Sequence, residues 1–135
     1  MPETLQQKVT FPTSPETLFD VYLDSRKHTM ATGAKAIVSR RVGARFMAHA
    51  GHIRGRILAI VPKRLIVQTW RGSDWKPEDL DSVLVLVFSK VRRGARVSMV
   101  HANVPDAHAA SIARGWVTYY WKPWKAHLRK TSRER

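Results

Sequence analysis

The sequence predicts an α+β fold in which a seven-stranded antiparallel sheet wraps around a long C-terminal helix. Three of the five tryptophans lie in residues 112–128, where apolar positions recur at helical spacing. They cover a face wider than the usual apolar stripe of ~100°, so this helix needs a curved partner and not a flat one. Seven segments of strand length in the rest of the chain can supply that partner.

The N-terminal region predicts one strand followed by two short helices. Residues 5–11 alternate apolar and polar side chains, which is typical of a strand with one buried face, although Gln7 interrupts the inner row. A helix should then begin at Ser14-Pro15, with Ser14 as the N-cap and Pro15 in the first helical position.

Gly and Pro residues separate six more segments of strand length. The Arg93-Gly94 turn pairs the last two segments as a hairpin, and the Val104-Pro105 break allows Asp106 to cap the long helix. The six segments are residues 34–39, 44–48, 53–60, 65–70, 81–89 and 96–104.

The long helix carries two neighbouring rows of apolar residues on its predicted buried face. Each row steps by four, three and four residues, as helical geometry requires. Aromatic side chains held above a concave sheet can roof a cavity between helix and sheet. The first row is Ile112, Trp116, Tyr119 and Pro123, and the second is Val117, Trp121, Trp124 and Leu128.

Length and charge indicate a single basic domain that spans residues 1–135. The chain has 24 Lys and Arg against 10 Asp and Glu, and the net charge of +14 favours attraction to polyanions. We expect residues 129–135 to form a basic, frayed tail. The chain has no cysteine, its start does not resemble a signal peptide, and its longest apolar runs have only strand length. These features favour a cytoplasmic location without membrane insertion.

Motifs distributed along the chain from Val9 to Leu128 resemble a known family. They are Gly55-Arg56-Ile57-Leu58 leading to Pro62, Ile66-Val67-Gln68-Thr69-Trp70-Arg71, Ser82, His101 with Val104-Pro105, Gly115-Trp116, and Tyr120-Trp121-Lys122-Pro123. In these motifs the chain is similar to the activators of heat-shock protein 90 ATPase, which belong to the START-like, or SRPBCC, superfamily of helix-grip ligand-binding domains. The resemblance implies a seven-stranded antiparallel sheet around the C-terminal helix. The eukaryotic co-chaperones carry an additional N-terminal domain that engages the chaperone, and without a counterpart of it this chain is expected to stimulate the chaperone little.

Strand parity and helical spacing predict which residues line a cavity between the sheet and the long helix. Trp70 and Tyr120 are the strongest candidates for ligand contact, because each needs a partner for its polar atom when it is buried. Any of these side chains can instead be ordinary core. The predicted lining is Phe19, Leu23, Met30, Phe46, Ile57, Trp70, Leu84, Leu86, Phe88, Val97, Met99, His101, Trp116, Tyr119 and Tyr120.

Titratable residues give weaker functional signals. His101 lies in an apolar row, where its imidazole either meets a ligand or is neutral and bonded to a neighbouring hydroxyl. His49 and His52 form an H-x-x-H pattern without the further ligands that a metal site needs. Since nucleotide and nucleophile motifs are also absent from the sequence, it predicts no cofactor, no metal and no catalytic residue.

Two classes of function remain open. In the favoured one, the domain binds a small hydrophobic or amphipathic molecule as a carrier or sensor. In the alternative, it is a binding module for an acidic macromolecule, either nucleic acid or an acidic protein, which includes a chaperone-related role. The aromatic residues cluster on the core helix and are not interleaved with the arginines, which argues against base stacking. The charged groups of the alternative are Arg54, Arg56, Arg92, Arg93, Arg96 and the tail.

Overall fold

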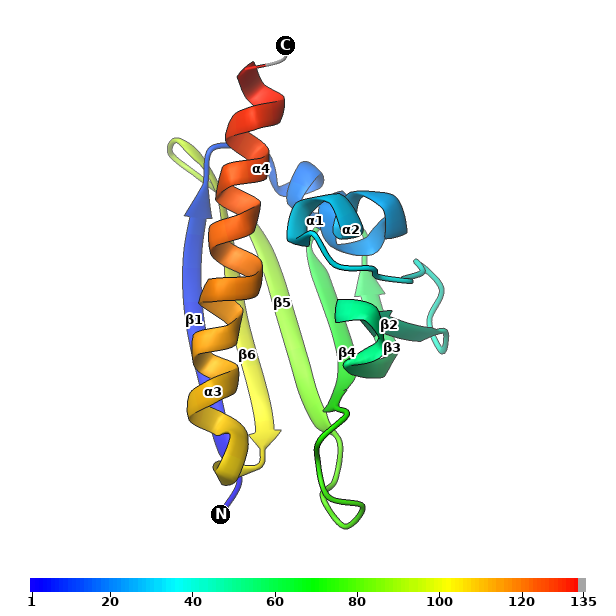
Figure 1. The fold of residues 1–135 in the computed structure, drawn as a ribbon. Helices are drawn as coiled ribbons and strands as arrows, with labels where there is room; N and C mark the ends of the chain where they lie inside the picture. The colour runs from blue at the N-terminus through cyan, green and yellow to red at the C-terminus, as the bar shows by residue number, and fades with distance from the viewer. Residues whose placement is uncertain (134–135) are drawn as a thin grey trace.

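The computed structural model describes residues 1–133 and contains one antiparallel sheet curved around a long C-terminal helix (Figure 1). The sheet order is β1-β6-β5-β4-β3-β2, so the first strand pairs with the last. Six of the predicted segments are confirmed as strands, with ends within two residues of those expected. The strands are β1 (Glu3–Phe11), β2 (Arg45–Ala48), β3 (Ile53–Val61), β4 (Leu65–Gly72), β5 (Ser82–Val91) and β6 (Gly94–Val104).

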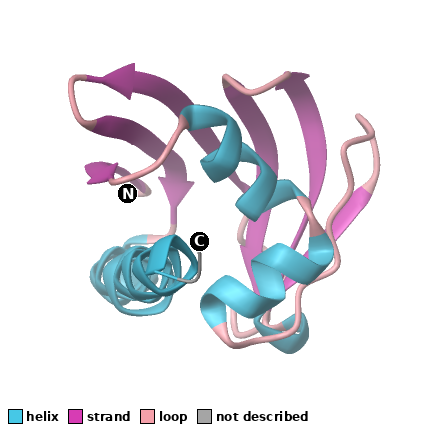
Figure 2. Ribbon diagram, turned by 90° about the horizontal axis from the view of Figure 1, so that it is seen from above, coloured by secondary structure: helices cyan, strands magenta, loops and turns pink. Residues whose placement is uncertain are grey.

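Two short helices, α1 (Pro15–Leu23) and α2 (Ser25–Thr32), follow β1 as expected. Ser14 is the N-cap of α1, and its hydroxyl accepts a hydrogen bond from the Thr17 N–H at 3.1 Å. Asp24 ends α1 and caps α2 through its carboxylate. Both helices lie on the same side of the sheet as the C-terminal helix (Figure 2).

The predicted seventh strand, residues 34–39, is wrong. Within this segment Ile37 makes a single bridge, to Met47. The backbone of Val38 is hydrogen-bonded to the Ser25 hydroxyl on α2. This hydroxyl donates to the Val38 carbonyl at 3.2 Å and accepts from the Val38 N–H at 2.9 Å. Since Ile37 directs its own backbone groups to β2, those of Val38 point away from β2, and Ser25 bonds them on that side. With one bridge and no ladder in this segment, the sheet formed by residues 1–133 has six strands.

The C-terminal helix is built from three consecutive segments. They are α3 (Asp106–Trp116), a five-residue π-helical turn (Val117–Trp121) and α4 (Lys122–Arg133). The backbone of residues 129–133, which we expected to fray, continues α4, and residues 134–135 lie outside the described residues.

The expected capping role of Asp106 is wrong. Pro105 precedes the first helical residue and makes no side-chain cap bond. The Asp106 carboxylate pairs with the amino group of Met1 at 3.2 Å instead. A carboxylate in the first turn still interacts favourably with the helix dipole, so α3 begins with a charge and not with a cap.

The π-helical turn changes which side chains of the long helix are buried. A π-turn holds one more residue than an α-turn, so the side chains within and beyond it are rotated from the α-helical spacing. Trp116 and Trp121 are consequently stacked, with ring centroids 5.3 Å apart and an interplanar angle of 19°. Tyr120 and Trp124 are buried, whereas Tyr119, which the simple helical pattern places on the buried face, is 59% exposed.

The core lies between the concave face of the sheet and the three helical regions. Gln7, the polar exception on the inner row of β1, is satisfied there. Its side-chain oxygen accepts from the Trp121 indole N–H at 2.7 Å, and its side-chain nitrogen donates to the Ala113 carbonyl at 2.9 Å. These two bonds connect the first strand to the C-terminal helix. Because both polar atoms of the Gln7 side chain have partners, burying them costs little free energy.

Candidate functional site

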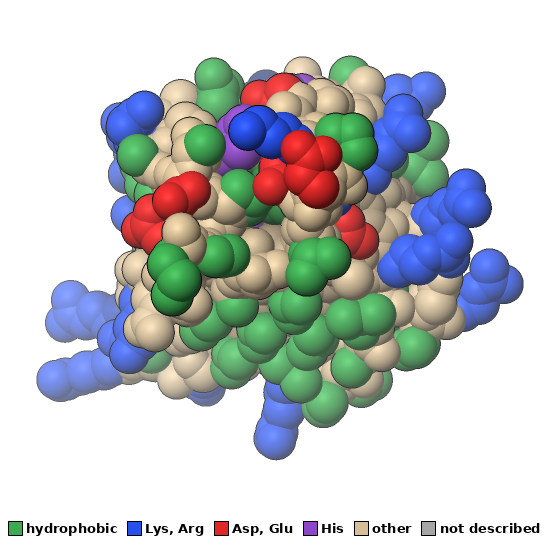
Figure 3. Space-filling model, turned by 90° about the horizontal axis from the view of Figure 1, so that it is seen from below, with side chains coloured by type: hydrophobic (Ala, Val, Ile, Leu, Met, Phe, Trp, Pro, Cys, Tyr) green, Lys and Arg blue, Asp and Glu red, His purple; other side chains and the backbone are tan. Residues whose placement is uncertain are grey.

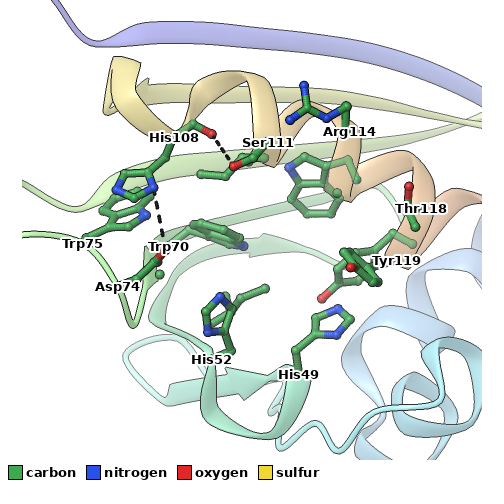
Figure 4. Close-up of a pocket in the computed structure, with 16 residues that line it drawn as sticks. His49, His52, Trp70, Asp74, Trp75, His108, Ser111, Arg114, Thr118 and Tyr119 are labelled. Atoms are coloured by element: carbon green, nitrogen blue, oxygen red, sulfur yellow. Dashed lines mark hydrogen bonds and ion pairs between the residues drawn. The ribbon is translucent and has the colours of Figure 1, made fainter.

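A cleft of about 660 Å³ opens between α3, the π-helical turn and the ends of β3 and β4 (Figure 4). A short turn, His49–Gly51, and the loop after β4 complete its walls. The side chains that define its chemistry are Trp70, Trp75, Trp116, Tyr119 and Tyr120, together with His49, His52 and His108.

Aromatic rings form a continuous wall of the cleft. Trp70 contacts Trp75 with centroids 5.7 Å apart and Trp116 with centroids 6.4 Å apart. The ring centroids of Trp116 and Tyr120 are 4.7 Å apart. All four residues are buried, so the cleft is bounded by the edges of rings that are fixed in the core.

The structure separates the predicted lining into three groups. Trp70, Trp116, Tyr119 and Tyr120 do line the cleft. Met30 is 59% exposed, because α2 buries His28 and Ala31 and thereby turns Met30 to the opposite side. The remaining residues are packed in the core and not in the cleft wall: Phe19, Leu23, Phe46, Ile57, Leu84, Leu86, Phe88, Val97, Met99 and His101.

His101 lies behind the cleft wall and is fully buried. Its Nδ1 is bonded to the Trp116 indole at 3.1 Å, and its Nε2 to the Ser82 hydroxyl at 2.8 Å. Burial lowers the pKa of His101 to about 3, so the imidazole is neutral. Of the two roles open to it from sequence, the structure supports the neutral histidine bonded to a neighbouring hydroxyl.

The Tyr120 hydroxyl is likewise committed to the core. The His28 Nδ1–H donates to the Tyr22 carbonyl at 2.8 Å, which leaves His28 Nε2 to accept from the Tyr120 hydroxyl at 3.1 Å. Burial lowers the pKa of His28 to about 4 and raises the pKa of Tyr120. Only the ring of Tyr120 is therefore offered to the cleft.

A strained turn presents His49 to the cleft. His49 and Ala50 have φ angles of 47° and 57°, a left-handed conformation that is unfavourable for residues with a side chain. The imidazole packs edge-on against Tyr119 and Tyr120, with centroids 5.7 Å and 5.2 Å away. Its Nε2 is buried without a partner among the described residues. Burial, and then the neighbouring His52, lower the pKa of His49.

The other two histidines of the cleft are engaged with polar neighbours. His52 Nδ1 is 2.7 Å from the Ser73 hydroxyl. His108 Nδ1 lies 3.9 Å from the Asp74 carboxylate, and its ring stacks on Trp75 at 6.0 Å. The two histidines of the H-x-x-H pattern thus have different surroundings, since one faces tyrosines and the other a serine.

Sequence reasoning missed Trp75 and His108 as cleft residues. Trp75 lies in a polar loop between β4 and β5, where nothing in the periodicity marks it as buried. A large aromatic side chain within a run of polar residues is itself a signal, because such a side chain usually finds a surface to cover. His108 carries no comparable signal.

Arginines gather on the outer face of β2, β3 and β4. Arg45 lies directly opposite Arg56, and Arg54 lies opposite Arg71. An open groove of about 470 Å³ runs between them. Arg71 is held by two backbone carbonyls of the loop after β4 and by Asp81. Arg54 and Arg56 each make one side-chain bond, to the carbonyls of Gly51 and Gly43, and are less restrained.

The arginines of the proposed macromolecular surface do not form one patch. Arg54 and Arg56 lie on β3 and Arg96 lies on β6, and β4 and β5 separate these strands. Between them the outer face is apolar, with Val67, Val85 and Val100 in one row across the sheet. Figure 3 shows an apolar area of this kind with Lys and Arg side chains at both margins.

None of the helices in residues 1–133 combines the length and the apolar composition that crossing a bilayer requires.

Comparisons with known proteins agree with this architecture. A family model described as Activator of Hsp90 ATPase homolog 1-like protein matches residues 12–129. The chain is 29% identical over 115 residues to the Activator of 90 kDa heat shock protein ATPase homolog 1 of Homo sapiens. The aligned region covers 85% of this chain and 34% of the human protein. The chain thus spans about a third of the length of the curated relatives that it matches.

Solved structures with the same fold include an HSP90 activator from Plasmodium falciparum. Its TM-score is 0.85 at 23% identity, over 93% of this chain and 95% of that chain. Protein MLL2253 from Mesorhizobium loti has a TM-score of 0.83 at 20% identity, over 96% of this chain and 98% of that chain. With a family model that covers most of its length, the chain belongs to the family of Activator of Hsp90 ATPase homolog 1-like proteins.

Proposed function

We propose that this chain binds a small, mostly apolar molecule in the cleft beside α3. The observation that carries the proposal is the wall formed by Trp75, Trp70, Trp116 and Tyr120 around an opening of about 660 Å³. Clefts of this size and composition suit small ligands, and the burial of aromatic surface supplies most of the affinity.

Binding without chemistry is the role that the polar groups of the cleft support. His108 pairs with Asp74, and His52 is bonded to Ser73. The pKa of His49 is lowered, so its imidazole is neutral at pH 7 and forms an uncharged part of the cleft wall. A carrier or sensor needs this kind of site, in which fixed rings provide shape and few charged groups must lose water.

The test is a fluorescence titration with an environment-sensitive hydrophobic dye near neutral pH. Gly115 lines the cleft, and a Cβ at this position would meet Tyr119 at 3.6 Å, an ordinary contact. We expect saturable binding to the wild type and about tenfold or more weaker binding to Gly115→Leu, which fills part of the cleft. Ala110→Leu, on the exposed side of α3, is the control and should bind as the wild type does. Linear, non-saturating emission from the wild type contradicts the proposal.

A second candidate is a surface for an acidic macromolecule at Arg45, Arg54 and Arg56. Like charges directly opposite one another on neighbouring strands are unfavourable, and an anion placed between Arg45 and Arg56 would reverse that effect. The human relative is named as an activator of a 90 kDa heat shock protein ATPase, so such a chaperone is a candidate partner for this surface. Because the chain matches only about a third of that protein, a chaperone-related role is the weaker of the two proposals.

A further inference from the structure

The histidines that face the cleft are engaged by neighbouring side chains. His52 is bonded to Ser73, and His108 is paired with the Asp74 carboxylate. The imidazole of His49 is partly buried between two tyrosine rings, which disfavours its protonated form. Two of the three imidazoles thus already have polar partners, and the third is packed against rings.

Arg114 does not supply a charge to the interior. It is the only Lys or Arg among the described residues that line the cleft. Arg114 is exposed, and Figure 4 shows its side chain along α3, so its charge lies at the rim of the cleft and not among the buried rings. An ionised ligand in the cleft would lose hydration without gaining a counter-charge, which is costly.

The indole N–H of Trp70 is a free hydrogen-bond donor in the cleft. The indole of Trp116 donates to His101, and that of Trp121 donates to Gln7. The hydrogen bonds within residues 1–133 give Trp70 no acceptor for its indole, and Figure 4 shows the ring nitrogen directed into the cleft. Since an indole N–H only donates, the group that meets it must be an acceptor.

We infer that the cleft selects flat, uncharged aromatic molecules that carry a hydrogen-bond acceptor, such as an aryl ketone whose oxygen accepts from Trp70 Nε1–H. The inference rests on the proposed small-molecule function and specifies its ligand class. The flat shape follows from the walls, because fixed rings at Trp70, Trp116 and Tyr120 make their best contacts with another ring in offset or edge-on geometry.

Three probes of similar size test the ligand class by equilibrium dialysis at pH 7. They are 2-acetylnaphthalene, 2-ethylnaphthalene and 2-naphthoate, which differ in acceptor and charge but share one ring system. We expect saturable binding of the ketone and about 2–10-fold weaker binding of the hydrocarbon, the factor that one neutral hydrogen bond contributes. Naphthoate should bind most weakly, because its charge is not compensated.

Two variants assign the donor. Trp70→Phe keeps an aromatic ring and removes the N–H, so it should abolish the preference for the ketone over 2-ethylnaphthalene, even if the smaller ring weakens the binding of both probes. Trp75→Phe removes an indole from the same wall and should keep the preference. A measurement on the wild type avoids the question of whether the variants fold. The five tryptophans give five indole N–H signals in a ¹⁵N–¹H correlation spectrum. The Trp70 signal should move downfield when the ketone is added and should not do so with the hydrocarbon.

The outcomes separate this inference from the function on which it rests. Naphthoate binding more tightly than the ketone, or a ketone preference that survives Trp70→Phe, would overturn the inference and leave small-molecule binding intact. Non-saturable behaviour of all three probes and of the hydrophobic dye would overturn the proposed function itself.

Discussion

The Trp116 indole N–H donates to Nδ1 of His101 at 3.1 Å, and this bond determines the tautomer of the imidazole. Because Nδ1 accepts, Nε2 carries the proton and donates to the Ser82 hydroxyl, which donates in turn to the Trp70 carbonyl at 2.6 Å. Three bonds thus connect the long helix to β6, β5 and β4. They hold Trp116 and Trp70, the central rings of the cleft wall, in fixed positions.

Replacing His101 by Phe should destabilise the fold although ring volume is kept. The change leaves the Trp116 N–H without an acceptor in a buried site and removes a partner of Ser82, at a cost of about 2 kcal/mol or more in the free energy of unfolding. Urea unfolding measures it. His52→Phe, at an exposed imidazole, is the control and should change stability by less than about 0.5 kcal/mol. An unchanged midpoint for His101→Phe would contradict the role assigned to it.

Stability should fall as the pH is lowered from about 6.5 towards 4. The pKa of His28 is about 4 and that of His101 about 3, against an ordinary value of 6.5, because both are buried. In this window the unfolded chain binds more protons than the folded chain, so the free energy of unfolding decreases with falling pH. Each of the two histidines contributes up to about 1.4 kcal/mol per pH unit to the slope of the free energy of unfolding against pH.

Urea unfolding at pH 7, 6, 5 and 4.5 measures this slope. The stabilisation is complete above pH 6.5 and is lost as the pH approaches the folded pKa values of His28 and His101. His52→Gln, at an exposed histidine, should retain the slope. A flat stability profile across these pH values would refute the neutral state of the two buried histidines.

Adding a methyl group at Gly55 should be strongly destabilising. A Cβ at this position would overlap the carbonyl oxygen of Thr69 and lie 2.8 Å from Cε1 of Phe46. Since the backbone of the sheet must shift to accommodate it, we expect Gly55→Ala to lower the free energy of unfolding by about 3 kcal/mol. Gly115→Ala is the matched control, because its Cβ makes only ordinary contacts and helix propensity favours Ala by about 1 kcal/mol. Equal thermal midpoints for the two variants would contradict this expectation.

Binding to duplex DNA should be weak and independent of sequence. With a net charge of +14, some binding at low salt is expected, and at physiological salt the Kd should be on the order of 10⁻⁴–10⁻⁶ M. The logarithm of the association constant should fall with the logarithm of the salt concentration, with a slope of about −0.9 per phosphate neutralised. Fluorescence anisotropy over a salt series measures the slope for the wild type and for a triple Ser variant at Arg45, Arg54 and Arg56.

The same experiment tests the arginine surface. If the three arginines contact the polyanion, the triple variant should reduce the slope by up to about 2–3, whereas an Arg92→Ser/Arg93→Ser variant at the β5–β6 turn should reduce it less. An equal reduction by both would show that total charge alone is responsible. A sequence-selective complex of nanomolar affinity at physiological salt would favour a nucleic-acid-binding module over the small-molecule proposal.

The chain alone should stimulate a heat-shock protein 90 ATPase little, because it matches only about a third of the human activator. Steady-state ATP turnover of the chaperone at stoichiometric concentrations of this chain measures the effect. A several-fold rise in turnover would contradict the expectation. In that case the triple Ser variant at Arg45, Arg54 and Arg56 would show whether this surface is the cause.

Local patterns in the sequence determined most of the elements of this fold. Alternation predicted β1, segment length with Gly and Pro punctuation predicted the other five strands, all to within two residues, and the Ser14-Pro15 pair predicted the start of α1. These features depend on the conformational preferences of neighbouring residues and on a period of two or 3.6 in burial, which are properties of a short stretch of chain. The aromatic content of residues 112–128 likewise predicted a long helix embraced by the sheet.

Contacts between distant residues decided the rest. Residues 34–39 have a strand-like composition, yet only Ile37 forms a bridge to β2, and the backbone of Val38 is bonded to Ser25 of α2. Tyr120 is buried as the sequence predicted, but within the π-helical turn Tyr119 is 59% exposed, which the α-helical pattern did not predict. In each case a hydrogen bond or ring contact outweighs a local preference that is worth less than about 1 kcal/mol per residue.

The position of the cleft depended entirely on tertiary structure. Sequence parity placed a cavity among the core residues, but those side chains fill the space between sheet and helix, and the opening lies at one end of the helix beside Trp70 and Trp75. Sequence could say that Trp70 and Tyr120 carry polar atoms in need of partners. Only the fold decided that His28, 92 residues away, bonds to Tyr120 and that the indole of Trp70 stays free, because such pairing is fixed by which surfaces meet in space.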